Sequence, residues 1–287
     1  MNLKISDVRH HQGDSAFLID DGKTSILYDT GFGFTGFNVA ENIKAVLGER
    51  PLDYIFLSHS HYDHALGSAY ILRHYPNAKV VAGTHAVGVF MRDGAKRTMK
   101  KLDAAFAEKC GVTDYEFLGD ELRVDIAVDD GDIIHAGDLA FEAIHLPGHT
   151  RCCMGYYCEQ EGFFLSSETL GVYDGKELIA PSFLVSYTEA IASIVKIEKR
   201  NIRSILSPHF GLLDEMQTDF FLSNMKAVSQ QLARELLDGL KQGCSEAEII
   251  EQYKARYWRG YIREIYPEDA VQLNTSIMIR LIKNELM

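Results

Sequence analysis

The sequence predicts a mixed α/β (α+β) body over residues 1–213, followed by a helical extension over residues 214–287. Two observations support this division. Short apolar runs rich in β-branched and aromatic residues alternate with helical stretches in both halves of the first part. After residue 214 these runs stop, and apolar residues recur at helical spacing. No short-period repeat and no low-complexity segment interrupts the chain.

The N-terminal segment is typical of a β-hairpin. Residues 15–19 and 24–28 are apolar strand-like runs, and Asp20-Asp21-Gly22 between them is a turn sequence. A helix is expected around residues 38–47. A short apolar strand over 54–57 then leads directly into a histidine-rich segment.

The rest of the first part continues the alternation of strands and helices. Helices are expected over 65–75, 94–110 and 188–199, and strands over 79–82, 122–127, 133–134, 139–145, 154–158, 162–165 and 204–206.

The extension contains clear helix signals. Residues 216–240 have apolar side chains at helical spacing. Residues 245–248 read Ser-Glu-Ala-Glu, which fits the S-x-x-E capping box at the start of a helix. Pro267 followed by two acidic residues predicts the start of a last helix toward Leu286.

Composition and charge exclude several classes of protein. The chain of 287 residues has 29 basic and 41 acidic side chains, a net charge of −12, which argues against nucleic acid as a partner. No apolar run is long enough to cross a bilayer, and no apolar segment follows Lys4 as in a secretion signal. We therefore expect a cytoplasmic protein with a small-molecule substrate and no membrane partner. A homodimer is an open alternative to a monomer.

The five cysteines indicate reduced thiols. Their odd number, the lack of framework spacing and the lack of a secretion signal argue against disulfides. Adjacent Cys152 and Cys153 are expected to be small buried residues.

The segment LSHSHYDHALGS, residues 57–68, crowds four potential metal ligands into six positions: His59, His61, Asp63 and His64. His59 and His61 are two residues apart just beyond a strand, so both can point to one side. Packing accounts for one buried histidine but poorly for three beside an aspartate. The segment therefore predicts a metal site.

A zinc or iron site needs further ligands, and two histidines later in the chain are candidates. His149 follows a strand and a Pro-Gly turn, and His209 follows the short apolar strand at 204–206. Ligands on loops at strand ends are the usual arrangement in metalloenzymes.

These motifs together resemble the metallo-β-lactamase superfamily. His59-Ser60-His61-Tyr62-Asp63-His64 matches H-x-H-x-D-H, the hallmark of that family. Asp29 lies in D-T-G, His149 in P-G-H-T, and His209 comes late in the chain. The resemblance spans residues 1–213 and implies a four-layer αββα sandwich with metals at one edge.

The resemblance also implies a role for each residue. The implied ligands are His59, His61 and His149 for a first metal, and Asp63, His64 and His209 for a second. Asp29 would fix the motif loop through hydrogen bonds. The bridging position, usually aspartate in the family, is matched here by Glu168, which lies nineteen residues after His149. Asp174, in a Tyr-Asp-Gly turn, is the alternative.

Two divalent ions would activate water for attack on a substrate. A bound ion lowers the pKa of water from about 16 to about 7 and polarises a substrate oxygen. Asp63 would orient the nucleophile and pass a proton to the leaving group. Zn²⁺ is the first expectation, and the same donors also suit Fe or Mn.

The resemblance implies a hydrolase of a small ester, thioester, lactone or phosphoester, similar to glyoxalase II-like or lactonase-like members. In those members C-terminal helices wall the substrate pocket. Tyr173, Phe183 and Tyr187 would line such a pocket or pack in the core. Two alternatives stay open: an iron redox enzyme resembling flavodiiron proteins or persulfide dioxygenases, and a metal-bearing regulatory protein with incidental turnover.

Overall fold

The computed structural model describes residues 3–287. Its strands form two six-stranded sheets and one two-stranded sheet, with helices between and after them. The chain forms two compact units, one made of the chain up to His145 together with Met154–Glu161, the other of Leu146–Cys153 and Gly162–Met287. The predicted fold class is confirmed, whereas the domain boundary after residue 213 stays a prediction.

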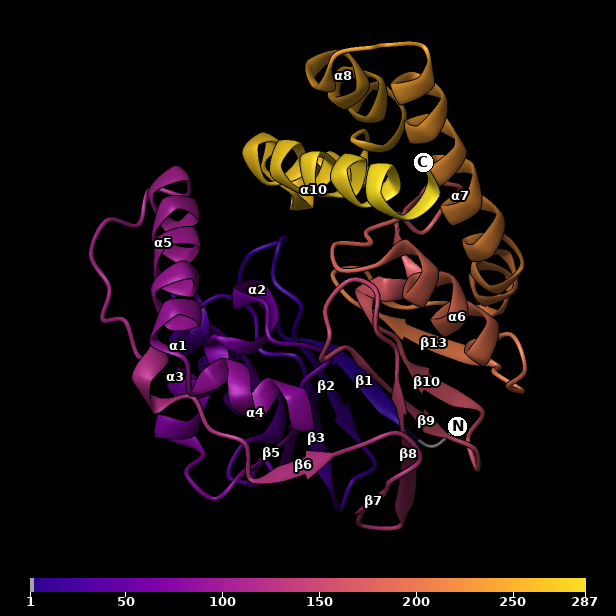
Figure 1. Ribbon diagram of the computed structural model, residues 1–287. Helices are drawn as coiled ribbons and strands as arrows, with labels where there is room; N and C mark the ends of the chain where they lie inside the picture. Colours follow the sequence, from indigo (N-terminus) through magenta and orange to yellow (C-terminus); the bar gives the residue numbers. More distant parts are fainter. Residues whose placement is uncertain (1–2) are drawn as a thin grey trace. The chain divides into compact units, whose positions relative to one another are not determined.

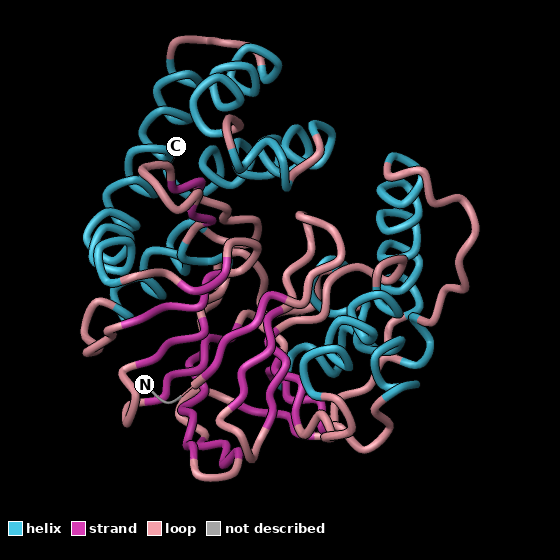
Figure 2. The backbone as a smooth tube through the Cα atoms, turned by 180° about the vertical axis from the view of Figure 1, so that it is seen from behind, coloured by secondary structure: helices cyan, strands magenta, loops and turns pink. Residues whose placement is uncertain are grey.

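The first sheet belongs to the first unit. Its strands are, in spatial order, β1 (Lys4–Asp7), β2 (Phe17–Asp20), β3 (Ser25–Tyr28), β4 (Tyr54–Phe56), β5 (Lys79–Gly83) and β6 (Ile126–Val128). The first three strands pair antiparallel, as the predicted hairpin requires, and β3 to β6 pair parallel. Figure 2 shows the strands in magenta, seen from behind.

Parallel neighbours need a crossover connection, which explains the helices of this unit. They are α1 (Gly36–Leu47), α2 (Tyr62–Ala65), α3 (Gly67–His74), α4 (Thr84–Phe90) and α5 (Asp93–Lys109). Helix α1 joins β3 to β4, and α2 and α3 join β4 to β5. Helices α1, α3 and α4 lie on one side of the first sheet (Figure 1).

The other face of the first sheet packs against an antiparallel ribbon. This ribbon contains β7 (Ile133–Ala136), β8 (Leu139–His145) and β9 (Met154–Cys158). The ring of Phe56 on β4 lies 5.4 Å from Phe141 and 4.8 Å from Tyr156. The hydroxyl of Tyr156 donates to the carbonyl of Leu57 at 2.8 Å. Strands facing strands, with helices outside, form the expected sandwich.

The second unit has its own strands and helices. Strand β10 (Phe163–Leu165) pairs parallel with β13 (Ser204–Ser207), which pairs antiparallel with β14 (Gly211–Leu212). Strands β11 (Val172–Tyr173) and β12 (Ile179–Ala180) form a small hairpin, and α6 (Tyr187–Ile197) precedes β13.

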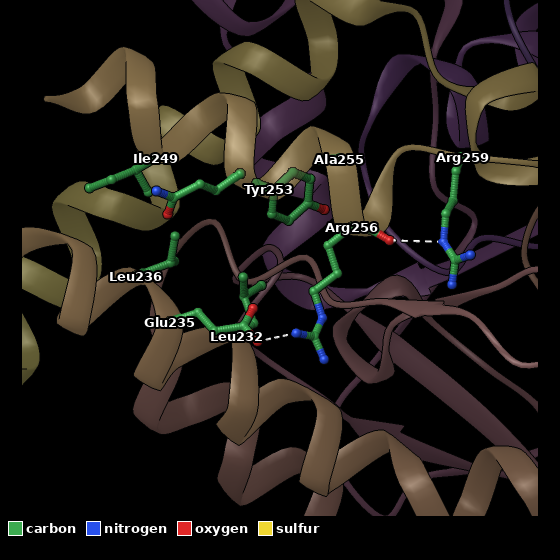
Figure 3. Close-up of a pocket in the computed structure, with 9 residues that line it drawn as sticks. Leu232, Glu235, Leu236, Ile249, Tyr253, Ala255, Arg256 and Arg259 are labelled. Carbon is green, nitrogen blue, oxygen red and sulfur yellow. Dashed lines mark hydrogen bonds and ion pairs between the residues drawn. The ribbon is translucent and has the colours of Figure 1, made fainter. Parts of the chain in front are cut away.

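The chain ends in four helices: α7 (Glu215–Lys241), α8 (Glu246–Tyr257), α9 (Tyr261–Ile265) and α10 (Glu268–Leu286). Figure 1 shows α7, α8 and α10 packed together. The capping box predicted at Ser245 and Glu248 is present, and a second one opens α7 at Asp214. An open groove of about 750 Å³ lies between α7 and α8, where Glu235 pairs with Arg256 at 2.6 Å (Figure 3).

Several expectations from the sequence are corrected or settled. The strand predicted over 122–127 is wrong at its start, because β6 begins only at Ile126 and ends at Val128. Arg123, before this strand, donates from Nε to Asp125 Oδ2 at 3.2 Å. Tyr173 and Phe183 are 1% exposed and belong to the core.

Among residues 3–287, none of the helices has the length and the apolar composition that a membrane-spanning helix needs.

The cysteines behave as the sequence predicts. Cys152 and Cys153 are buried, and none of the five cysteines forms a disulfide among residues 3–287. Burial raises the pKa of the Cys153 thiol to about 12, so it stays protonated at neutral pH.

Asp103 on α5 is a buried acid that makes stability depend on pH. It is 0% exposed, accepts hydrogen bonds from the backbone N–H of Gly33 and from the Tyr115 hydroxyl, and burial raises its pKa to about 6 from 3.8. Between about pH 4 and pH 6 the folded protein holds a proton that the unfolded chain has released. The free energy of unfolding therefore falls as pH rises through this range.

We expect Asp103→Asn to remove this dependence. Urea unfolding near pH 4 and near pH 7 should show the variant gaining about 3 kcal/mol relative to wild type at the higher pH, since a shift of about two pKa units has that magnitude. A difference between the two proteins that does not change with pH would contradict the role of Asp103.

Candidate metal centre

The first unit brings the four ligands of the motif segment together. The segment leaves β4 and enters α2, with His61 in extended backbone at the N-terminus of that helix. The His59 ring lies 4.6 Å from the His61 ring and 4.1 Å from the His64 ring. Asp63 Oδ2 lies 3.7 Å from His64 Nε2. Three imidazoles and a carboxylate from this one segment therefore lie close together.

The buried carboxylate of Asp29 holds this loop through hydrogen bonds. The residue is 0% exposed and adopts a φ of +55°. Its oxygens accept hydrogen bonds from the Ser58 backbone N–H at 2.7 Å and from the hydroxyls of Ser58 and Ser15, each at 2.9 Å. Oδ2 also lies 2.8 Å from His64 Nδ1. A carboxylate on Nδ1 fixes the tautomer and orientation of an imidazole that binds metal through Nε2.

Gly67 explains how the loop can lie so close to Asp29. A Cβ at this position would come within 2.0 Å of the Thr30 carbonyl oxygen. The neighbouring Thr30 donates from both its N–H and its hydroxyl to the carbonyl of His64. Glycine at the end of the motif is therefore a requirement of the close backbone approach.

His149 is the first candidate ligand in the second unit. Its Nδ1 lies 2.8 Å from the carbonyl oxygen of Ser182 and 3.0 Å from the Ser182 hydroxyl. Gly148 precedes it at a φ of +138°, and a Cβ there would lie 2.6 Å from Cα of Ala190. The turn is thus pressed against α6, and Nδ1 is engaged while Nε2 points to Glu168 at 2.8 Å.

Glu168 lies between two histidines of the second unit. It follows β10 in a short 3₁₀ helix (Glu168–Leu170) and is 2% exposed. Its Oε2 is next to His149 Nε2, and its Oε1 lies 3.1 Å from His209 Nε2. His209, just beyond β13, adopts a φ of +61°. One buried carboxylate therefore offers each of its oxygens to a different imidazole.

Asp174, the alternative bridging residue, has another role. Its Oδ1 accepts hydrogen bonds from the backbone N–H groups of Lys176, Glu177 and Leu178. It therefore closes the turn between β11 and β12.

Sequence reasoning missed three residues that touch the ligands of the second unit. Ser182 holds His149, the Tyr261 hydroxyl donates to the His209 carbonyl, and the Tyr266 hydroxyl donates to Glu168 Oε1. Their spacing in the sequence does not indicate these contacts, because only the tertiary packing of the second unit brings the residues together.

The donor chemistry of both sets fits a metal ion. Imidazole nitrogens and carboxylate oxygens suit zinc, iron and manganese. The Nδ1 atom lies beside a serine or aspartate oxygen in His59, His64 and His149. In each of these rings Nε2 therefore faces the other potential metal-ligand atoms. Nearly all of these side chains are buried, where a carboxylate needs a compensating positive charge. Each unit therefore holds a cluster of metal-binding residues.

A sandwich of two sheets that carries an H-x-H-x-D-H loop after a strand defines the metallo-β-lactamase class of folds. The model of the metallo-beta-lactamase superfamily matches residues 13–209 of this sequence. The chain belongs to that superfamily, so the resemblance is confirmed.

Individual relatives are distant. The chain is 29% identical over 140 residues to "Glyoxylase B2" of Dictyostelium discoideum, a match that covers 48% of this chain and 43% of that protein. It is 27% identical over 216 residues to a probable metallo-hydrolase of Burkholderia pseudomallei, covering 74% and 68%. The chain thus spans less than half of the first relative.

A solved structure shares the fold. The metallo-beta-lactamase family protein from Thermus thermophilus matches with a TM-score of 0.62 and 18% identity, over 92% of this chain and 87% of that one.

The contribution of Asp29 to holding the motif loop can be measured through the free energy of unfolding. We expect Asp29→Ala to lower the free energy of unfolding by about 3 kcal/mol or more, because several buried donors lose their acceptor at once. Asp21→Ala is the matched control, since Asp21 also accepts two backbone hydrogen bonds, but at an exposed turn. Equal losses in urea unfolding of the two variants would argue against this role of Asp29.

Proposed function

We propose that this protein is a metal-dependent hydrolase that cleaves a small ester, thioester, lactone or phosphoester at a dinuclear centre. The observation that carries the proposal is Glu168, a buried carboxylate with one histidine beside each oxygen. Membership of the superfamily and the name of the Burkholderia relative support the hydrolase class.

In this proposal the ligands of the two units act together. His59, His61 and His149 would hold the first ion, Asp63, His64 and His209 would hold the second, and Glu168 would be a ligand to both. Bound divalent ions supply Lewis-acid chemistry, lowering the pKa of water and polarising the substrate oxygen. Zinc is the proposed metal, and iron or manganese would fit the same donors.

The protein's own residues position the reactants. Asp63 is 8% exposed, so its carboxylate is shielded from bulk water but reachable from the site. It would orient the attacking water, accept its proton and return that proton to the leaving group. His64 is held by Asp29, so the neighbouring Asp63 projects from a fixed turn of α2.

Metal analysis and a substrate panel test this function together. Protein purified without added metal should contain about two ions per chain, as expected for a two-metal site, and should hydrolyse at least one ester, thioester, lactone or phosphodiester. The iron redox enzyme is the competing function. Native iron, with oxygen consumption and no hydrolysis of any substrate, would overturn our proposal in its favour.

A substitution in the motif segment tests the ligand assignment. His61→Ala should lose one of the two ions and lower turnover by at least about 100-fold, the scale on which metal sites respond to loss of supporting groups. His74→Ala is the control, because His74 lies on the partly exposed end of α3 beside Glu41. Full metal content and full turnover in His61→Ala would refute the assignment.

A further inference from the structure

The segment around α9 reaches the ligands of the second unit through two tyrosines. Tyr261, the first residue of α9, donates its hydroxyl to the backbone carbonyl of His209. Tyr266, just after α9, donates its hydroxyl to Glu168 Oε1. The Tyr266 ring also lies edge-on to the His209 imidazole, with 5.3 Å between their centres. The C-terminal helices therefore contact both a candidate ligand and the carboxylate next to it.

Tyr266 is held in place by its own backbone. The indole N–H of Trp258 donates to the Tyr266 carbonyl at 2.9 Å, and the Tyr266 N–H donates to the Ile262 carbonyl at 3.2 Å. Pro267 follows, and Tyr266 has the extended conformation, φ −111° and ψ 124°, that a residue before proline prefers. The carbonyl and the N–H of Tyr266 are both hydrogen-bonded, and Pro267 restricts its backbone conformation. The backbone that carries the phenol therefore has little freedom to move away from Glu168.

The length of the glutamate side chain makes this contact specific. An aspartate at position 168 would hold its carboxylate about 1.5 Å closer to the backbone, the length of one carbon–carbon bond. The backbone of Tyr266 is anchored at its carbonyl and its N–H, so a shorter side chain at position 168 would withdraw the acceptor from the place where the hydroxyl now lies. The hydrogen bond therefore depends on the length of glutamate at this position.

We propose that Tyr266 is a positioning residue that holds Glu168 by Oε1 and thereby sets the affinity of the metal centre. The proposal rests on the proposed function, because it takes Glu168 as a metal ligand. A carboxylate ligand that is free to rotate loses orientation entropy on binding, and a hydrogen bond to it reduces that cost. Through Tyr266, metal binding is coupled to the packing of α8, α9 and α10.

The direct test is metal affinity in Tyr266→Phe. We expect at least one of the two dissociation constants for Co²⁺ to rise about 10- to 100-fold, the usual effect of removing a partner that orients a ligand. Competition with a chelator gives the constants, and the visible absorption of bound Co²⁺ reports any change in ligand geometry. Circular dichroism of the metal-free protein should match wild type, because the helices keep their packing.

The matched control is Tyr257→Phe. The Tyr257 hydroxyl also donates to a glutamate, Glu235 at 3.2 Å, which pairs with Arg256 beside the groove between α7 and α8 (Figure 3). The variant loses the same hydroxyl from the neighbouring helix α8 without touching Glu168, so Co²⁺ affinity should equal that of wild type. Equal weakening in both variants would mean that loosening of the helices, and not the contact with Glu168, sets the affinity.

A double-mutant cycle separates this inference from the proposed function. In a Glu168→Asp background the contact is already lost, so adding Tyr266→Phe should change Co²⁺ affinity by less than about twofold. If the two substitutions weaken Co²⁺ binding by amounts that add fully in the double variant, the role of Tyr266 is overturned. Wild-type binding of two ions with unchanged affinity in Tyr266→Phe would overturn the inference alone. A wild type that binds no divalent ion would overturn the proposed function and the inference with it.

Discussion

The structure depends on the way buried carboxylates hold histidine side chains. A carboxylate withdrawn from water is costly unless hydrogen bonds or an opposite charge compensate it. Asp29 meets this requirement with three hydrogen bonds from serine groups and with the imidazole of His64. Glu168 meets it with His149, His209 and the Tyr266 hydroxyl. In both units the same chemistry that makes burial tolerable also orients potential metal ligands.

The candidate histidines lie close to the ends of strands. His59, His149 and His209 each come within four residues after a strand, so the paired strands fix where each loop begins. The loops themselves are tied down by side chains and by glycines at close backbone approaches, as at Gly67. A rigid scaffold with short, anchored loops can hold donors within the tenths of an ångström that coordination requires.

The sequence predicts those features that are local in the chain. Three histidines within six positions predict a metal site, and the residues of the hairpin and the capping box at Ser245 encode their own conformation. The fold class follows from the alternation of strands and helices. In contrast, β1, α4 and α9 are too short for a periodic pattern, and the run at 122–125 is apolar in part but lies outside any strand. Tyr266 is 98 residues from Glu168, and only tertiary packing brings them together.

Positive backbone φ angles limit which residues two positions of this sequence can accept. Among residues 3–287, the non-glycine residues with positive φ are Asp29 and His209, one in each unit. Glycine would relieve the unfavourable conformation at either position, and most other side chains would increase it. Glycine, however, would remove the carboxylate or the imidazole. Selection for stability and selection for side-chain chemistry therefore act in opposite directions at these two positions. A lineage that lost the activity should reveal this by acquiring glycine there.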